Sequence, residues 1–166
     1  LPRYSPPKAW QASSIILKPN FIGHDIDLCN NKKGYIYVGR LEESKGIHSV
    51  LNAWKGLDDK FILTVIGDGS KKKHLMSKYS QSNILFKGRC SRRETLEGIA
   101  KSKYLIQPSI WYETFGLTII EAMSLGVPVI GFDIGTRPDF IRNGVNGFLA
   151  NDMNLKVTIG SAEYDF

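Results

Sequence analysis

Residues 34–67 contain the stretch that decides the fold, GYIYVGRLEESKGIHSVLNAWKGLDDKFILTVIG. The stretch begins and ends with short apolar, β-rich runs, and a segment of helix length at about 44–55 separates them. Runs that are apolar at nearly every position indicate strands covered on both faces, and strands joined through a crossover helix pair in parallel. The stretch therefore predicts a β-α-β unit of a parallel sheet.

The same alternation extends to both sides of this unit. Further strands are predicted at 13–18, 83–88, 103–108 and 127–132. Further helices are predicted at about 70–81, 91–101, 116–125, 137–143 and from about 152 onward. Six strands alternating with helices predict an α/β fold, a doubly wound, mostly parallel, Rossmann-like sheet with helices on both faces.

Composition limits the class of protein. The chain has 166 residues, a formal net charge of +6 and 42% hydrophobic residues, which is typical of one globular domain and excludes a second large one. Cys29 and Cys90 form neither a disulfide framework nor a zinc motif, so a reducing, cytoplasmic setting is expected. The longest strongly apolar stretch, 122–132, is too short to span a bilayer and is broken by Gly126 and Pro128.

The two ends of the chain indicate a piece of a longer protein. The sequence begins at Leu1 without a methionine or a signal leader, and it stops inside the helix expected from about 152. Residues 1–33 are predicted to be an interdomain linker and lead-in segment, because they start with several prolines and have no clear period. Residues 34–166 are predicted to be the domain itself.

The loops that follow the strands are the expected place for a ligand, because ligands bind at the carboxyl ends of strands in such sheets. After the first strand of the unit, Gly39 permits a close turn, and Arg40 and Lys45 place two cations near the following helix. Two cations near a helix amino terminus favour an anion site. Solvated surface charge is the alternative for each of them.

The loop after the second strand is GDGSKKK, residues 67–73. Gly67 and Gly69 can allow close approach of a ligand to the backbone. The three lysines are expected to form a solvated face, because positive charge at a helix start is unfavourable without a nearby anion.

A pair of carboxylates marks residues 113–131, ETFGLTIIEAMSLGVPVIG. Glu113 precedes a helix and Glu121 lies inside it, eight positions later, among apolar residues. A buried carboxylate needs a partner. A ligand hydroxyl, an internal ion pair and a capped backbone amide are the candidates for Glu121. Amides at the helix start near Gly116 can hold a phosphate beside Glu113.

Taken in order, VGRLEESKG, VIGDGS, LFKG, the E-x7-E element and GTRPDFIRNGVNGFL resemble the carboxyl-terminal domain of the retaining glycosyltransferases of family four, over about residues 19–150. The resemblance implies one half of a GT-B fold. It implies transfer of a sugar from a nucleotide-sugar to an acceptor glycan or lipid-linked sugar, with retention of configuration and without an obligatory metal or other cofactor. The acceptor-binding amino-terminal domain is not in this chain.

The resemblance also implies roles for single residues. Arg40 and Lys45 would bind the donor diphosphate, with Gly39 shaping the loop. Glu121 resembles the ribose-binding carboxylate, and Glu113 resembles the acid beside the transferred sugar. Arg89 and Cys90 would lie in the loop that reads the base, and the amides of Phe115, Gly116 and Leu117 would hold diphosphate or sugar hydroxyls.

Two other classes of function stay open at this point. A dinucleotide-binding oxidoreductase domain shares the fold class, but Gly67, Asp68 and Gly69 lack the third glycine of the GxGxxG fingerprint. A nucleic-acid-binding module would fit the basic balance, but no recognition motif accompanies the dispersed lysines, and we expect no nucleic-acid partner. The same basic balance is compatible with attachment of the longer protein to the inner face of a membrane.

Overall fold

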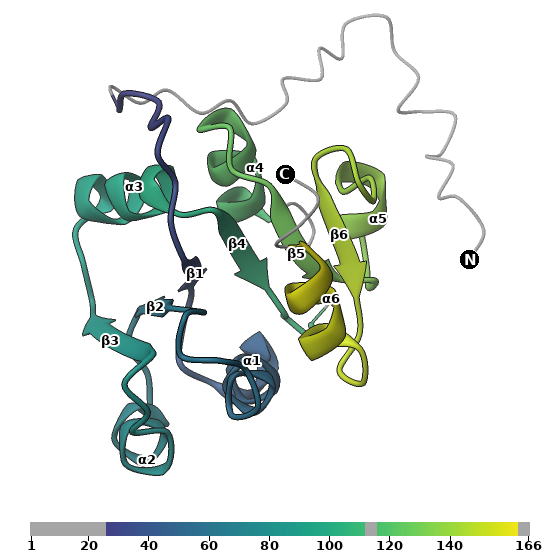
Figure 1. Ribbon diagram of the computed structural model, residues 1–166. Helices are drawn as coiled ribbons and strands as arrows, with labels where there is room; N and C mark the ends of the chain where they lie inside the picture. Colours follow the sequence, from purple (N-terminus) through teal and green to yellow (C-terminus); the bar gives the residue numbers. More distant parts are fainter. Residues whose placement is uncertain (1–25, 112–115, 163–166) are drawn as a thin grey trace, which may run out of the picture.

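The computed structural model describes residues 26–111 and 116–162. Its centre is one sheet of six strands, all paired in parallel in the order β3-β2-β1-β4-β5-β6 (Figure 1). The strands are β1 (Tyr35–Val38), β2 (Leu63–Ile66), β3 (Ile84–Gly88), β4 (Tyr104–Gln107), β5 (Val129–Phe132) and β6 (Gly147–Ala150). The strand order reverses between β1 and β4, so the predicted doubly wound, Rossmann-like fold is confirmed.

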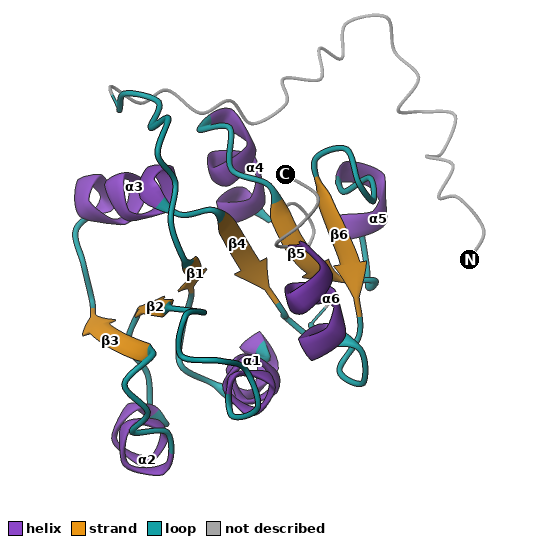
Figure 2. Cartoon of the chain, viewed as in Figure 1, coloured by secondary structure: helices purple, strands orange, loops and turns teal. Residues whose placement is uncertain are grey.

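Six α-helices connect or follow the strands. They are α1 (Ile47–Trp54), α2 (Lys72–Lys78), α3 (Arg92–Lys101), α4 (Leu117–Ser124), α5 (Arg137–Phe140) and α6 (Leu155–Ala162) (Figure 2). Each lies within or overlaps a helix predicted from the sequence, although most are shorter at one or both ends. None of these described helices is long and apolar enough to cross a membrane.

The sheet separates two apolar clusters. Side chains alternate along a strand, so Tyr35 and Tyr37 of β1 point to one face and Ile36 points to the other. The first face packs against α1, α2 and α6, and the second packs against α3 and α4. Helices therefore cover both faces, as predicted.

One expectation about the elements is wrong, and one strand was not predicted. The helix predicted at 44–55 is interrupted, because Gly46 adopts a left-handed φ of 68° between a 3-10 helix (Glu43–Lys45) and α1. A Cβ added at Gly46 would overlap the carbonyl oxygen of Pro108 in the loop after β4. Lys45 therefore ends the separate 3-10 helix and does not begin the longer one. The close approach of two loops distant in sequence imposes this break.

The set of strands also differs from the prediction. The strand expected at 13–18 lies outside the described residues. The sixth strand of the sheet is β6, for which no strand was predicted. Its four residues, GFLA, are too short to show a period, and only pairing with β5 identifies them as a strand.

Candidate functional site

A cleft of about 500 Å³ opens at the carboxyl ends of the first three strands. Its lining comes from the end of β1 and the residues after it (Val38, Gly39 and Arg40), from the end of β2 and the residues after it (Ile66, Gly67 and Asp68), and from the segment after β3 into α3 (Arg89, Cys90 and Thr95). Its volume is in the range of sites for small molecules, and its place beside the reversal of strand order is where such sheets bind ligands. Five of the lining residues, Gly39, Arg40, Gly67, Arg89 and Cys90, were predicted from the sequence as site residues.

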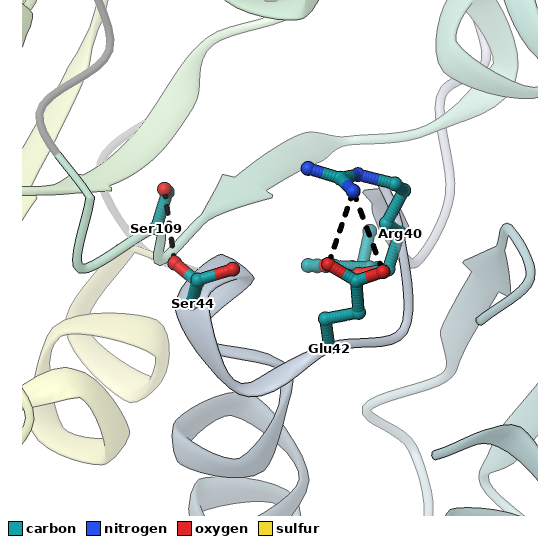
Figure 3. Close-up of polar contacts among 5 residues, drawn as sticks. Arg40, Glu42, Ser44 and Ser109 are labelled. Carbon is teal, nitrogen blue, oxygen red and sulfur yellow. Dashed lines mark hydrogen bonds and ion pairs between the residues drawn. The ribbon is translucent and has the colours of Figure 1, made fainter. Parts of the chain in front are cut away.

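Arg40 extends into solvent at the β1 side of this cleft. Its Nη1 lies 3.2 Å from the Glu42 carboxylate, and 68% of its side chain is exposed (Figure 3). The backbone beneath it is held by the Tyr37 hydroxyl, which donates to the Arg40 carbonyl oxygen at 3.0 Å. Exposed ion pairs contribute little to stability. An anionic ligand can therefore replace Glu42 as the partner of this guanidinium.

The loop after β1 is fixed against the loop after β4. The hydroxyl of Ser109 donates to the carbonyl oxygen of Ser44 at 3.3 Å (Figure 3). The amide of Ile110 donates to the same oxygen at 3.2 Å. Lys45 follows Ser44 directly, but it is not among the described residues that line the cleft. Its contact with a diphosphate stays a prediction.

The glycines after β2 serve the backbone of the sheet. A Cβ added at Gly67 would overlap the carbonyl oxygen of Gly39, so glycine allows the ends of β1 and β2 to approach. Between the glycines, Asp68 accepts from the Lys72 ammonium at 3.0 Å and from the Gly69 amide at 2.8 Å. The bond from Lys72, followed by that from Gly69, lowers the pKa of Asp68. The ammonium of Lys72 is thus paired with the Asp68 carboxylate of the same loop. Gly69 does not line the cleft within the described part of the chain.

The start of α3 is fixed by a capping box next to the cleft. The Ser91 hydroxyl accepts from the Glu94 amide at 3.2 Å, and the Ser91 amide donates to the Glu94 carboxylate at 2.8 Å. Hydrogen bonds from Ser91 lower the pKa of Glu94. This reciprocal arrangement satisfies free amides at a helix start. It holds the first turn of α3, including the lining residue Thr95, against the cleft.

The same turn supplies a partner for Glu121. Nη1 of Arg92, the first residue of α3, donates to Oε1 of Glu121 in α4 at 2.7 Å. Of the two side chains, 65% of Arg92 is exposed but only 12% of Glu121. Among the partners considered from the sequence, the internal ion pair is the one present. Glu121 does not itself line the cleft among the described residues.

The loop between β4 and α4 is described only at its two ends. Glu113 and Phe115, which the sequence marks as site residues, lie outside the described residues. Gly116 caps α4 with a φ of 61°, and Leu117 begins the helix with an exposed side chain. The roles of their amides stay predictions.

Sequence reasoning missed Arg137, which braces the neighbouring loops. This side chain is buried, although it carries a charge. Its Nε donates to the carbonyl oxygen of Phe132 at 2.8 Å, and its Nη2 donates to that of Ser109 at 2.6 Å. These bonds tie the end of β5 to the loop after β4. The motif GTRPDF contains this arginine, but nothing in its spacing signals burial.

Other residues were missed because their types are common. Val38, Ile66 and Thr95 line the cleft with ordinary strand and helix side chains. Arg92 was not distinguished from its neighbour Arg93, and only the capping box gave a local signal for where α3 begins. Across residues 26–111 and 116–162, no group of three or more histidine, cysteine, aspartate or glutamate side chains could hold a metal ion.

Comparison with known proteins identifies the family. Residues 25–157 match the family model described as glycosyl transferases group 1. The chain belongs to the glycosyl transferases of group 1. The resemblance drawn from the sequence motifs is thereby confirmed.

Curated relatives of this group 1 domain are longer proteins. An uncharacterized 41.2 kDa protein in the cps region of Klebsiella pneumoniae is 33% identical over 131 residues, which are 77% of this chain and 36% of that protein. A GDP-mannose-dependent alpha-mannosyltransferase of Corynebacterium glutamicum is 34% identical over 131 residues, 79% of this chain and 30% of the relative. The chain thus spans about a third of the length of these relatives.

Solved structures share the fold of this group 1 domain. The lipopolysaccharide outer core galactosyltransferase WaaB has a TM-score of 0.70 and 25% identity, over 80% of this chain and 40% of WaaB. HepE of Anabaena, solved in complex with UDP-glucose, has a TM-score of 0.70 and 24% identity, over 81% of this chain and 40% of HepE. The described sheet is therefore one half of a GT-B fold.

Proposed function

We propose that this chain is the donor-binding half of a retaining glycosyltransferase. It binds a nucleotide-sugar, and the longer protein transfers the sugar to an acceptor glycan or lipid-linked sugar. In this proposal residues 34–166 form the donor domain, and residues 1–33 link it to a domain that binds the acceptor. Membership of group 1 and the cleft at the carboxyl ends of β1, β2 and β3 support this reading.

The observation that carries the proposal is the presence of Arg40 on the wall of that cleft. Departure of a nucleoside diphosphate from the sugar develops negative charge, and fixed cations that face this charge lower the barrier. Arg40 is positioned to exchange Glu42 for a phosphate oxygen, and charge-assisted bonds of this kind are the strong ones. Lys45 is proposed as a second cation for the diphosphate.

The names of relatives support the class of donor but not one base or sugar. One relative is GDP-mannose-dependent, and one solved structure contains UDP-glucose. We therefore propose a nucleotide-sugar as the donor and leave its base and sugar undefined. The proposed reaction needs no metal or other cofactor and no nucleic acid. The proposed location is the cytoplasm, with the longer protein peripheral to the inner face of a membrane.

Roles for the remaining site residues complete the proposal. Glu121 accepts hydrogen bonds from the ribose, Glu113 lies beside the transferred sugar, and the loop of Arg89 and Cys90 contacts the base. The amides of Phe115, Gly116 and Leu117 hold the diphosphate or sugar hydroxyls, and Gly39, Gly67 and Gly69 shape the floor of the site.

The test is calorimetric titration of the 166-residue chain with UDP, GDP, ADP, their glucose or mannose conjugates, and NAD. We expect a nucleoside diphosphate to bind and Arg40→Ala to weaken it by about 1.5 to 3 kcal/mol, the usual contribution of a hydrogen bond to a charged group. Arg142→Ala removes an exposed arginine that does not line the cleft and is the matched control.

The outcomes separate the function from the residue assignment. If no nucleotide of the panel binds, the donor-binding function is wrong. Binding of NAD alone would favour the oxidoreductase alternative. An unchanged dissociation constant in Arg40→Ala, with binding by the parent, would remove Arg40 from the site but leave the function standing.

A further inference from the structure

We propose that Arg92 is the positioning residue for Glu121. Its guanidinium holds the carboxylate in the orientation that accepts hydrogen bonds from the ribose hydroxyls of the donor, so Arg92 sets the preference of the protein for ribonucleotides over deoxyribonucleotides. This inference rests on the proposed function, since it assumes a nucleotide in the cleft with its ribose at Glu121.

The contact between Arg92 and Glu121 is short, and the two side chains differ greatly in exposure. Nη1 of Arg92 lies 2.7 Å from Oε1 of Glu121, and no other side chain in the described residues bonds this carboxylate. Glu121 is nearly enclosed, whereas Arg92 reaches it from solvent. A carboxylate with few surrounding partners depends on the one that it has. Arg92 therefore decides which way the carboxylate faces.

The pair leaves acceptor capacity for a ligand. A carboxylate has two oxygens with about four acceptor positions, and the bond from Arg92 uses one position on Oε1. Two ribose hydroxyls can be accepted by the positions that remain. Arg92 and a ribose can thus share Glu121 without competing for the same position.

Arg92 is held at the border of the cleft by its own helix. It is the first residue of α3, directly after the Ser91 cap, and it stands in the chain between the lining residues Cys90 and Thr95. The next residue, Arg93, is bound differently, since its Nε lies 2.9 Å from the Glu97 carboxylate on the same helix. The two adjacent arginines therefore have separate partners.

Apolar packing joins α3 to α4 in addition to the ion pair. Leu96 and Ile99 of α3 belong to the same buried cluster as Ile119 and Ala122 of α4. Apolar packing of this kind fixes the two helices relative to each other. The expected effect of Arg92 is therefore on the orientation of one side chain, and it should appear in ligand selectivity before it appears in folding.

The experiment compares selectivity among variants of the 166-residue chain. Calorimetry gives the affinities of UDP, GDP and ADP and of their 2′,3′-dideoxy counterparts for the parent, Arg92→Ala, Arg92→Lys, Glu121→Gln and Arg93→Ala. We expect the parent to prefer the ribonucleotide by at least about tenfold, the value of one good hydrogen bond to a charged group, because the dideoxy form lacks both hydroxyls that Glu121 would accept. Arg92→Ala and Glu121→Gln should each bring this ratio close to one.

The controls distinguish positioning from structure. Arg93→Ala removes the adjacent arginine and should keep the ratio of the parent, and Arg92→Lys should retain part of it. The double variant Arg92→Ala with Glu121→Gln should lose no more selectivity than either single variant, because both act on one interaction. Circular dichroism confirms the fold, and Arg92→Lys still tests the proposal if Arg92→Ala does not fold.

Three results would contradict the proposed function, the role of Glu121 or the role of Arg92. A parent that binds no nucleotide overturns the proposed function and this inference with it. A parent that binds ribo- and dideoxyribonucleotides equally overturns the inference alone. An Arg92→Ala variant that loses both affinities by the same factor, with its ratio unchanged, shows that Arg92 has only a structural role.

Discussion

The two faces of the sheet differ in their content of buried aromatic side chains. On the face covered by α1, α2 and α6, the ring of Tyr35 packs edge-on against Trp54, with 5.4 Å between the ring centroids, and stacks with Tyr104, with 5.7 Å between the centroids. The opposite face, under α3 and α4, is aliphatic, with Ile36 and Leu105 of the strands in its core. Aromatic pairs add directional contacts to the area that they bury. Aliphatic side chains contribute mainly buried area.

Both faces carry polar side-chain bonds, and those of the aliphatic face lie at both of its ends. The aliphatic face carries Arg92 with Glu121 at one end of α3, and at the other end the Lys32 ammonium donates to the carbonyl oxygens of Ala100 and Leu125. The helices of this face thus connect the candidate site to the lead-in segment. We expect the aromatic face mainly to stabilise the fold, and the aliphatic face also to set the geometry around Glu121.

The largest effect is expected on the aromatic face. Trp54→Ala should lower the free energy of unfolding by about 3 to 5 kcal/mol, because it removes a fully buried ring. It also removes the indole donor to the Phe61 carbonyl oxygen. Urea unfolding gives the free energy of unfolding, and Trp54→Phe should lower it less than Trp54→Ala does. Nucleotide affinity of the folded variant should match the parent; a large loss would show that this face also shapes the site.

A matched truncation on the aliphatic face should act on both stability and binding. Ile99→Ala empties a fully buried position and should destabilise the fold by about 2 to 4 kcal/mol. Because α3 begins beside the cleft, we expect nucleotide affinity to fall as well, measured by calorimetry at a temperature where the variant is folded. Unchanged affinity would contradict the distinction between the faces.

Loss of the Lys32 ammonium, which caps the carbonyl oxygens of Ala100 and Leu125, should have a smaller effect on stability. Burial lowers the pKa of Lys32, so its charge is held at some cost and its two bonds offset that cost. Lys32→Met should destabilise the fold by about 1 to 2 kcal/mol in thermal unfolding, because hydrogen bonds to a charged group contribute about 1.5 to 3 kcal/mol and burial of the ammonium offsets part of this. Lys33→Met changes an exposed neighbour and is the control. Equal melting temperatures for the two variants would contradict the capping role.

The smallest effect concerns pH on the aromatic face. Burial, and then the charge of Lys78, lowers the pKa of His48 from its ordinary value of 6.5. The unfolded chain therefore binds a proton before the folded chain does, and stability should fall as the pH drops from about 6.5 toward the lowered pKa. In His48→Gln this decline should be shallower by less than about 1 kcal/mol, measured by urea unfolding at pH 7.5 and 5.5. Identical declines would contradict the assignment.

The sequence by itself determined the fold class and the edge of the sheet that bears the cleft. Apolar runs alternating with helix-length segments require parallel pairing, since the crossovers leave no other arrangement. The sequence was sufficient to predict a residue's position wherever that position depends only on its neighbours in the chain. Arg40, Arg89 and Cys90 lie within two residues of a strand end, so their place at the carboxyl edge was predictable.

Tertiary structure alone decided the features that join distant segments. Gly46 breaks a helix because Pro108 approaches it, and β6 is a strand because β5 pairs with it. The partner of Glu121 is Arg92, 29 positions earlier in the chain, and no period or motif distinguishes that arginine from the one beside it. Contacts between residues far apart in sequence depend on how helices pack, and a residue's own neighbours do not encode that packing.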